Sequence, residues 1–379
     1  MKRILIFSLA YYPQVGGAEI ALKEITDRIN DIEFHAITLN FGGEKSEEKI
    51  GTIFVHRVGN GSSYFQKILF IPRAALAARV LHRRYSFDAF WAMMSYMVFP
   101  IVLLRMGGIR VPYLLTLQEG DPWEHMFNRW FILPFRPLLA YGFRQASEVQ
   151  TISTFLAGWA KRIGFHGMPV VIANGVDIAH FARTHVENKS GTIFLVTTSR
   201  LVHKNAVDDV IRALKFLPNN IHFIIYGIGP DEILLKKLAD EFGVSARMEW
   251  KGYIDHKDLP FALAACDIFI RPSRSEGMGN SFIEAMAAGL PVIATQEGGI
   301  ADFLFDAKRN PDTETTGWAV DKDSPEQIAE AVKEILENPE QATRIIANAK
   351  KLVEEKYDWN LIASCVRMLF QKIMHASAS

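Results

Sequence analysis

The chain has 379 residues, a length that favours two domains, and 49% of them are hydrophobic, enough to give each domain its own core. Lys+Arg and Asp+Glu both total 42, so the formal net charge is zero, which argues against a general nucleic-acid-binding protein. Two cysteines are too few for a metal cluster or a disulfide framework, and they predict free thiols in a reducing compartment.

The N-terminal residues predict a strand rather than a signal peptide. After Lys2 and Arg3, the apolar run at 4–10 is short, lacks a small-residue cleavage site and leads into a Gly-Gly pair. The most apolar later stretch, 89–104, falls short of the roughly 20 residues that span a bilayer. We therefore expect a cytoplasmic protein, with at most a peripheral contact at the inner face of the membrane.

Short apolar runs alternate with helix-period segments along the chain. Buried strands are expected at 4–8, 33–39, 89–93, 113–117 and 148–152, and in a second series at 193–198, 222–226, 268–271 and 292–294. Strands separated by helices indicate βαβ units and parallel sheets, so two such series predict two doubly wound α/β domains. A Gly/Pro-rich interruption at 164–169 divides them, which predicts an N-terminal domain at 1–167, a C-terminal domain at 168–355 and a final helical segment at 356–379.

The densest local signal is the segment from Arg271 to Glu284, in which a strand leads through a glycine-rich loop into a helix. Such a loop leaves backbone N–H groups at the helix N-terminus, where a phosphate binds well. Two carboxylates, Glu276 and Glu284, flank the loop. Because carboxylates repel phosphate, they are better suited to accept hydrogen bonds from hydroxyl groups. Ser281 to Glu284 also fits a capping box, so the sequence leaves a structural role for Glu284 open.

Three weaker signals follow the ends of other expected strands. Gly16 and Gly17 lie between the first strand and the first helix, where they allow a ligand to approach the backbone, although a plain turn fits equally well. Arg200 and Lys204 follow the strand at 193–198, where they are placed to neutralise a leaving diphosphate unless they are ordinary surface cations. Gly227 and Gly229 follow the strand at 222–226 but lack the third glycine of a dinucleotide fingerprint, which disfavours an NAD-dependent oxidoreductase.

Taken in order, these segments resemble glycosyltransferase family 4. The resemblance rests on Gly16-Gly17, the Asn-Gly-Val-Asp run at 174–177, the Ser-Arg-Leu-Val run at 199–202, Gly227-x-Gly229, the spacing of Glu276 and Glu284, and the Glu-Gly-Gly run at 297–299. It covers nearly the whole chain. It implies the GT-B architecture, in which two Rossmann-like domains face each other across a cleft and a C-terminal helix crosses back to the first. It also implies a retaining enzyme that needs no metal or other cofactor and takes a UDP- or GDP-linked sugar.

The resemblance implies a role for each matching residue. Glu276 would bind hydroxyls of the donor sugar, Glu284 would bind the ribose, and Arg200 would hold the phosphates. The loop from Gly277 to Asn280, with Met278 and Gly279 between them, would donate backbone hydrogen bonds to sugar and diphosphate. Donor contacts are also expected from Gly16, Gly17, Gly227 and Gly229, and catalysis from Glu276, Arg200 and Lys204.

Two positions depart from the family pattern. The family usually has a lysine where this chain has Asn205, so Lys204, one residue earlier, is expected to substitute for it. Many members have a histidine where this chain has Gln118, and an amide cannot act as a general base. Acid–base assistance is then left to Glu119, Asp121 or the departing phosphate. We expect Gln118, Glu119, Asp121 and Asn174 on the acceptor side.

Only two segments of the sequence, one basic and apolar and one aromatic, give an indication of the acceptor. Residues 63–85 predict a helix with five Lys or Arg residues beside an apolar face, which suits an anionic membrane surface or an ordinary surface helix. Residues 126–142 are rich in aromatic residues and either contact a lipid carrier or fill the core. No Asp-x-Asp pair stands where a metal-dependent transferase would need one, and the histidines show no metal-ligand spacing.

The sequence thus predicts a retaining transferase that moves a hexose or amino-hexose from a nucleotide diphosphate sugar to a glycan or lipid-linked acceptor in polysaccharide or glycolipid biosynthesis. Nucleic acid is not an expected partner. Two rival functions remain open: a nucleotide-sugar epimerase on the same architecture, and a catalytically silent protein that binds sugar nucleotides. The departures at Gln118 and Asn205 are the features that keep the second rival open.

Overall fold

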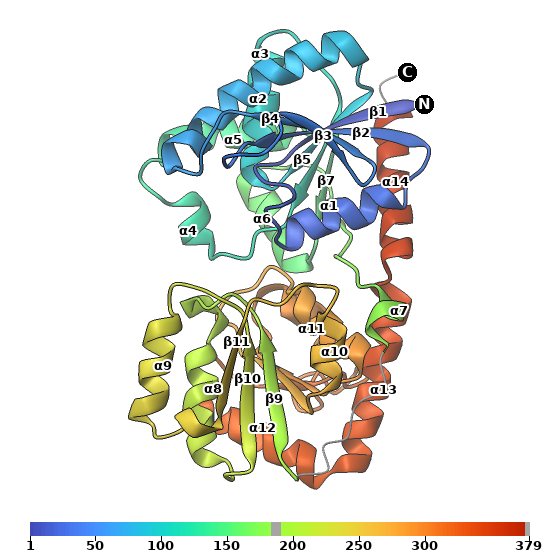
Figure 1. Cartoon of the computed structure of the whole chain (residues 1–379). Coiled ribbons are helices and arrows are strands. Elements are labelled where there is room, and N and C mark those ends of the chain that lie inside the picture. Colours follow the sequence, from blue (N-terminus) through green and yellow to red (C-terminus); the bar gives the residue numbers. More distant parts are fainter. Residues whose placement is uncertain (183–190, 376–379) are drawn as a thin grey trace. The chain divides into compact units, whose positions relative to one another are not determined.

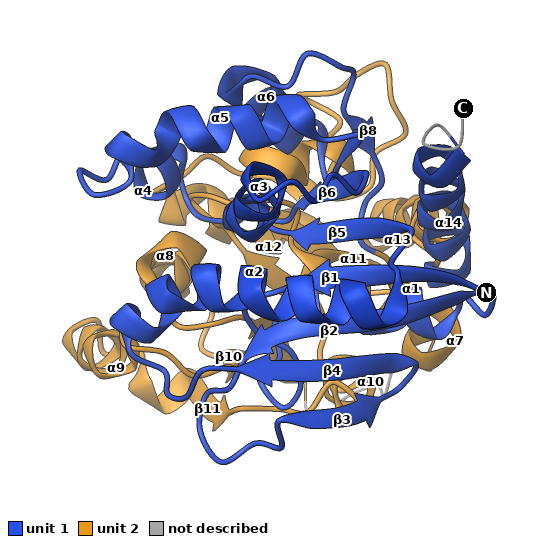
Figure 2. Ribbon diagram, turned by 90° about the horizontal axis from the view of Figure 1, so that it is seen from above, with its two compact units in different colours: residues 1–174, 359–379 blue, residues 175–358 orange. Residues whose placement is uncertain are grey.

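The structure is a computed structural model that describes residues 1–182 and 191–375. It divides into two compact units (Figures 1 and 2). Unit 1 comprises Met1–Asn174 together with Trp359–Ser379, and unit 2 comprises Gly175–Asp358.

Within the described residues, unit 1 is built on an eight-stranded sheet in the order β3-β4-β2-β1-β5-β6-β7-β8. Its neighbouring strands are parallel except β3, which runs antiparallel to β4. The strands are β1 (Lys2–Phe7), β2 (Ile32–Leu39), β3 (Glu47–Ile50), β4 (Ile53–Val58), β5 (Ala89–Met93), β6 (Tyr113–Leu117), β7 (Glu148–Thr151) and β8 (Val170–Val171). The helices are α1 (Gly17–Asp27), α2 (Tyr64–Tyr85), α3 (Val98–Met106), α4 (Trp123–Phe127), α5 (Arg136–Gln145), α6 (Thr154–Ile163) and α14 (Trp359–His375), with 3-10 turns η1 (Ser95–Met97) and η2 (Leu133–Phe135).

The central strands of unit 1 are buried on both faces, as a parallel sheet between helices requires. On one face, Ile4, Ile6 and Trp91 pack with α1 and α14 in a single apolar core. On the other face, Phe90 contacts His82 of α2. The last helix of the chain therefore completes a core that begins with the first strand.

Unit 2 holds a fully parallel sheet, six-stranded over residues 191–358, in the order β11-β10-β9-β12-β13-β14. The strands are β9 (Ile193–Thr198), β10 (Ile221–Tyr226), β11 (Met248–Gly252), β12 (Ile268–Arg271), β13 (Val292–Ala294) and β14 (Trp318–Ala319). The helices are α7 (Ile178–Phe181), α8 (Val207–Ala213), α9 (Glu232–Glu241), α10 (Leu259–Ala264), α11 (Asn280–Ala288), α12 (Pro325–Glu337) and α13 (Pro339–Lys356), with 3-10 turns η3 (His203–Asn205), η4 (Leu214–Phe216), η5 (Ser245–Arg247) and η6 (Gly298–Asp302). Figure 1 shows α8 and α9 beside β9 and β10.

The units divide a few residues later than the sequence predicted. The expected boundary between 167 and 168 lies before β8, whose two residues pair with β7 and so belong to the sheet of unit 1. The expected start of the final segment at 356 lies before the division after Asp358, because Val176 donates a hydrogen bond to the Tyr357 carbonyl at 2.7 Å within unit 2. Residues 376–379 of that segment lie outside the described residues.

Candidate functional site

The topology of unit 2 indicates a ligand site at the carboxyl ends of β9 and β12. The strand order reverses at this pair, since β10 flanks β9 on one side and β13 flanks β12 on the other. In open parallel sheets, ligands bind at the carboxyl ends of the strands at such a switch point. Arg200 and Lys204 follow β9, and the segment from Glu276 to Glu284 follows β12. The topology therefore gathers the predicted donor residues of unit 2 at one edge of its sheet.

The carboxylate of Glu276 is held by a buried cation that the sequence analysis missed. Arg271, the last residue of β12, is 6% exposed, and its Nη2 group pairs with Glu276. The same guanidinium donates to the hydroxyl groups of Ser281 at 2.7 Å and Ser273 at 3.1 Å. Burial lowers the pKa of Arg271, an effect that Glu276 opposes. One signal was available: an arginine closing an apolar strand needs a partner when it is buried.

The loop after Glu276 is shaped by two glycines at positive φ. Gly279 has φ +87°, and a side chain there would collide with the ring of Phe282. Gly298 has φ +61°, and a Cβ atom there would collide with the Glu276 carbonyl oxygen, which accepts a hydrogen bond from Gly299 at 3.1 Å. Gly279 is also the N-cap of α11 and has no side chain with which to cap it. In other proteins, helix N-termini are places where anions bind.

Glu284 is not a capping residue. Helix α11 begins at Asn280, so Ser281 lies inside its first turn, and its hydroxyl accepts from Arg271. The buried Glu284 carboxylate lies 3.0 Å from Nε2 of His256 instead. The capping-box interpretation is therefore wrong, because the chain turns into the helix two residues earlier than that pattern requires.

In the segment after β9, Asn205 has a structural role, and the candidate cations are its neighbours Arg200 and Lys204. Asn205 is 5% exposed, and its side-chain amide donates to the Arg200 carbonyl at 2.6 Å. Arg200 itself is exposed and Lys204 is half-buried. A buried amide that closes the loop cannot bind a phosphate as a lysine would, so Lys204 remains the nearest candidate cation.

Gly227 and Gly229 bring the loop after β10 against this segment. A Cβ atom on Gly227 would collide with the Ser199 carbonyl oxygen, and one on Gly229 would collide with that of Leu201. Leu201 also donates to the Ile228 carbonyl at 3.0 Å. These glycines are therefore required for the packing of two loops, whatever ligand they contact.

In unit 1, the Gly16-Gly17 pair leads into α1 as its N-terminal turn. Gly16 is the N-cap, and its N–H group donates to Glu19 at 2.8 Å. Both glycines are exposed at the carboxyl end of β1, which lies between β2 and β5 in the sheet. This is the switch point of unit 1, and ligands bind at such points in open parallel sheets.

The four predicted acceptor-side residues differ in accessibility. The amides of Gln118 and Asn174 form two reciprocal hydrogen bonds, at 3.0 and 3.1 Å. Glu119 is 1% exposed and accepts from the Ser95 N–H group at 2.6 Å, so it lies in the core. Asp121 is half-buried. The structure brings Gln118 and Asn174 together and directs Glu119 away from solvent.

The described residues were also examined for metal sites and for membrane-spanning helices. Over residues 1–182 and 191–375, no group of three or more His, Cys, Asp or Glu side chains could hold a metal ion. Among the helices in those same ranges, none combines the length and apolar character needed to cross a membrane.

Comparisons with known proteins show which family and which fold this chain resembles. The family model described as "Glycosyl transferases group 1" matches residues 180–352. The GDP-mannose-dependent alpha-(1-6)-phosphatidylinositol monomannoside mannosyltransferase of Mycobacterium tuberculosis is 32% identical over 96% of this chain and 97% of its own length.

Solved structures match the fold over nearly the whole chain. Sucrose-phosphate synthase from Thermosynechococcus elongatus superposes with a TM-score of 0.84 at 18% identity, covering 99% of this chain and 100% of that one. Anabaena HepE in complex with UDP-glucose superposes with a TM-score of 0.78 at 19% identity, covering 98% and 100%.

Proposed function

This chain belongs to the group 1 glycosyl transferases, and from that premise we propose that it is a retaining, metal-independent hexosyltransferase. Its donor is a nucleotide diphosphate sugar, and we propose a hexose or amino-hexose linked to GDP or UDP. The relative of 32% identity is named for GDP-mannose, so GDP-mannose is the first donor to test. The acceptor is a glycan or a lipid-linked sugar.

The observation that carries this proposal is the arrangement at the end of β12. A carboxylate, Glu276, is fixed by a buried guanidinium a few residues before the N-terminus of α11, which has no side-chain cap. We assign Glu276 to the hydroxyls of the donor sugar, the N-terminal turn of α11 to the diphosphate, and Glu284 with His256 to the ribose.

The proposed reaction is a displacement on one face of the sugar. The bond between the anomeric carbon and the diphosphate oxygen breaks, and a bond from the acceptor oxygen to the same carbon forms on that face. The acceptor proton passes to the departing diphosphate oxygen, whose charge Arg200 and Lys204 neutralise. One well-placed donor to developing charge is worth about 3–4 kcal/mol of barrier, so Arg200 and Lys204 are proposed to take the charge-neutralising role that a metal ion has in other transferases.

A membrane surface is the proposed setting for a lipid-linked acceptor. Helix α2 buries one apolar face, yet it also exposes Phe65, Ile68, Leu76 and Val80. Residues 61–85 contain five Lys or Arg residues and no Asp or Glu. The ring of Tyr64 contacts Phe131 at 5.8 Å, which joins α2 to a loop whose Trp130 is 82% exposed. Exposed apolar groups flanked by cations suit an anionic lipid surface.

The function is tested in two stages. First, thermal unfolding is followed with GDP, UDP, ADP, CMP and their common sugar conjugates; a ligand at a hundred times its Kd should stabilise the protein by about 2.7 kcal/mol. Second, transfer to candidate acceptors is followed by mass spectrometry. Donor consumption without acceptor would instead indicate an epimerase, and binding without consumption a silent protein.

The key variant is Glu276→Gln, which keeps the shape of the side chain but removes its charge. We expect transfer to fall by at least a hundredfold while the nucleoside diphosphate still binds. Glu249→Gln, on β11 of the same unit, is the control and should retain full activity. Unchanged turnover in Glu276→Gln would contradict the assignment of the sugar site.

A further inference from the structure

Arg274 lies in the loop between β12 and α11, two residues before Glu276, and uses all five of its N–H donors. Its side chain is 13% exposed. Nε donates to Asp323 at 2.6 Å, Nη1 to the His203 carbonyl and to Asp208 at 2.8 Å each, and Nη2 to Asp208 at 3.0 Å and Asp209 at 2.9 Å. Because every N–H group of the guanidinium has a partner, the side chain is fixed in one orientation.

The partners of Arg274 come from three separate segments of unit 2. His203 is in η3, Asp208 and Asp209 are in the first turn of α8, and Asp323 lies just before α12. The backbone N–H of Arg274 also donates to the Lys204 carbonyl at 2.7 Å. The loop that carries Glu276 and the segment that carries Lys204 are therefore bonded through both main chain and side chain.

The charged forms of Asp208 and Arg274 are favoured in this cluster, whereas burial and the neighbouring Asp208 raise the pKa of Asp209. Burial would raise the pKa of Asp208, but its bonds to Arg274 and Arg212 lower it overall. Burial opposes the charge on Arg274, yet its bonds to Asp208 and Asp323 raise its pKa. Ala206 and Asp323 are both held at φ +54°, a conformation that costs non-glycine residues free energy and persists where neighbouring contacts enforce it.

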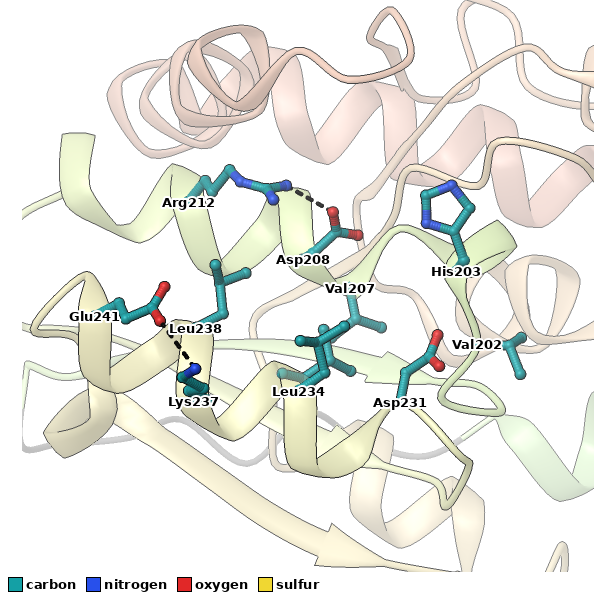
Figure 3. Close-up of a pocket in the computed structure, with 11 residues that line it drawn as sticks. Val202, His203, Val207, Asp208, Arg212, Asp231, Leu234, Lys237, Leu238 and Glu241 are labelled. Atoms are coloured by element: carbon teal, nitrogen blue, oxygen red, sulfur yellow. Dashed lines mark hydrogen bonds and ion pairs between the residues drawn. The ribbon is translucent and has the colours of Figure 1, made fainter.

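Arg212 provides a natural comparison. It donates to the same two carboxylates, to Asp208 at 2.6 Å and to Asp209 at 2.9 Å. Figure 3 shows it reaching Asp208 beside a cavity of about 200 Å³ that residues of α8 and α9 line. Its bonds are made within α8, whereas those of Arg274 cross between segments.

We propose that Arg274 is a positioning residue for the donor: it holds Lys204 at a fixed place relative to Glu276. The cation then meets the diphosphate while the carboxylate meets the sugar of the same molecule. This inference rests on the proposed function, which gives Lys204 and Glu276 those roles. A lysine cannot replace Arg274, because an ammonium group offers three donors from one point rather than five in a plane.

The test is a double-mutant cycle on nucleotide affinity, with Kd for GDP and for UDP measured by calorimetry. Lys204→Ala should weaken binding of the preferred diphosphate about tenfold, and Arg274→Met by a similar factor. In the Lys204→Ala background, Arg274→Met should add no more than twofold, because its effect passes through Lys204. Arg274→Lys should behave like Arg274→Met. The control, Arg212→Met, should bind within twofold of the wild type.

Folding is checked on the same samples by thermal unfolding. If Arg274→Met does not fold, Asp323→Ala removes only the Nε partner, whose side chain is 65% exposed, and should weaken binding two- to threefold. The inference is overturned if Arg274→Met loses as much affinity in the Lys204→Ala background as in the wild type, or if Arg212→Met matches it. It also falls if Lys204→Ala binds like the wild type. Failure of the wild-type chain to bind any nucleotide in the panel would instead contradict the proposed function.

Discussion

Burial changes the chemistry of Glu119, the carboxyl group that follows β6. Its burial raises its pKa, against the lowering effect of hydrogen bonds from Ser95. A raised pKa means that the folded state holds the proton more tightly than the unfolded chain does. The stability that this proton provides is therefore present at low pH and is lost as the pH rises from about 4.5 through the folded-state pKa.

Glu119→Gln should remove that loss, because glutamine keeps the acceptor for Ser95 and never ionises. We expect the variant to gain stability over the wild type as the pH rises from 4.5 to 8, by about 1.4 kcal/mol for each unit of pKa change. Thermal unfolding at several pH values measures the difference. Glu124→Gln, at an exposed position of α4, should show a constant difference. A flat profile for Glu119→Gln would disprove the prediction.

For single residues, the sequence identified candidate site residues but not the side chains that hold them in place. The spacing of Glu276 and Glu284 and the glycines between them were visible as a pattern, since a loop that approaches an anion needs such residues. The role of Arg271 was missed although its partners lie within ten residues, because the sequence does not show that its guanidinium is buried. The five bonds of Arg274 were not visible either, because their partners lie up to 71 residues away in sequence. Nor does a sequence reveal that Glu119 points into the core, since strand ends carry inward and outward side chains alike.

Among the elements, α2 has an unusual distribution of apolar residues. It covers the sheet with Phe70, Ala74 and Ala78, and it presents a second apolar stripe on its outer face. The expected helix at 63–85 is confirmed, with Ser63 as its N-cap. A two-faced helix has a weak amphipathic pattern, so its outer stripe needed the structure to be seen.

Reversing charges on the outer face of α2 should weaken membrane binding. We expect Arg79→Glu with Arg83→Glu to reduce association with vesicles of phosphatidylcholine and phosphatidylglycerol at least tenfold, since each cation near such a surface is worth about 1 kcal/mol. Co-sedimentation measures this. Lys237→Glu with Lys351→Glu, on unit 2, changes the net charge equally and serves as the control. The proposed membrane surface would be refuted if both double variants lost vesicle binding equally. It would also be refuted if the wild type bound neutral vesicles as well as anionic ones.

Most central strands were predictable, but Ile53–Val58, which lies between β3 and β2, was missed, and so were the edge strands. Each expected strand appears within a few residues of its predicted range, because a buried parallel strand is a short continuous apolar run. The missed strands include Glu47–Ile50 and Met248–Gly252, which lie at sheet edges and carry charged residues. Trp318–Ala319 has only two residues, too few to show any period.

For the whole molecule, the prediction of two Rossmann-like units in the GT-B fold is confirmed, as is the assignment to a glycosyltransferase family. Unit 1 is assembled from both ends of the sequence. Phe370 of α14 is fully buried, and its ring lies 5.1 Å from Trp91 and 6.1 Å from Phe34. Figure 2 shows α14 in the colour of unit 1.

Phe370→Ala should therefore destabilise unit 1 although it lies near the end of the chain. We expect the free energy of unfolding to fall by about 3–5 kcal/mol, the usual cost of removing a buried phenylalanine ring. Met368→Ala, two residues away and 57% exposed, should change it little. Denaturant unfolding compares the two variants, and equal stability would mean that α14 is not part of the core.

Because α14 belongs to unit 1, the two units become complete in a fixed order during synthesis. Unit 2 is one continuous stretch, so it has every residue it needs as soon as residue 358 leaves the ribosome. Unit 1 is begun first but must wait for α14, which follows after roughly 200 further residues. At about 5–20 residues per second, the roughly 200 residues between the end of the first part of unit 1 and Phe370 take about 10–40 s to make, and Phe34 and Trp91 remain uncovered throughout that time. During that interval, the first half of the nascent chain presents an apolar sheet face to chaperones, and unit 2 is synthesised in full before unit 1 is.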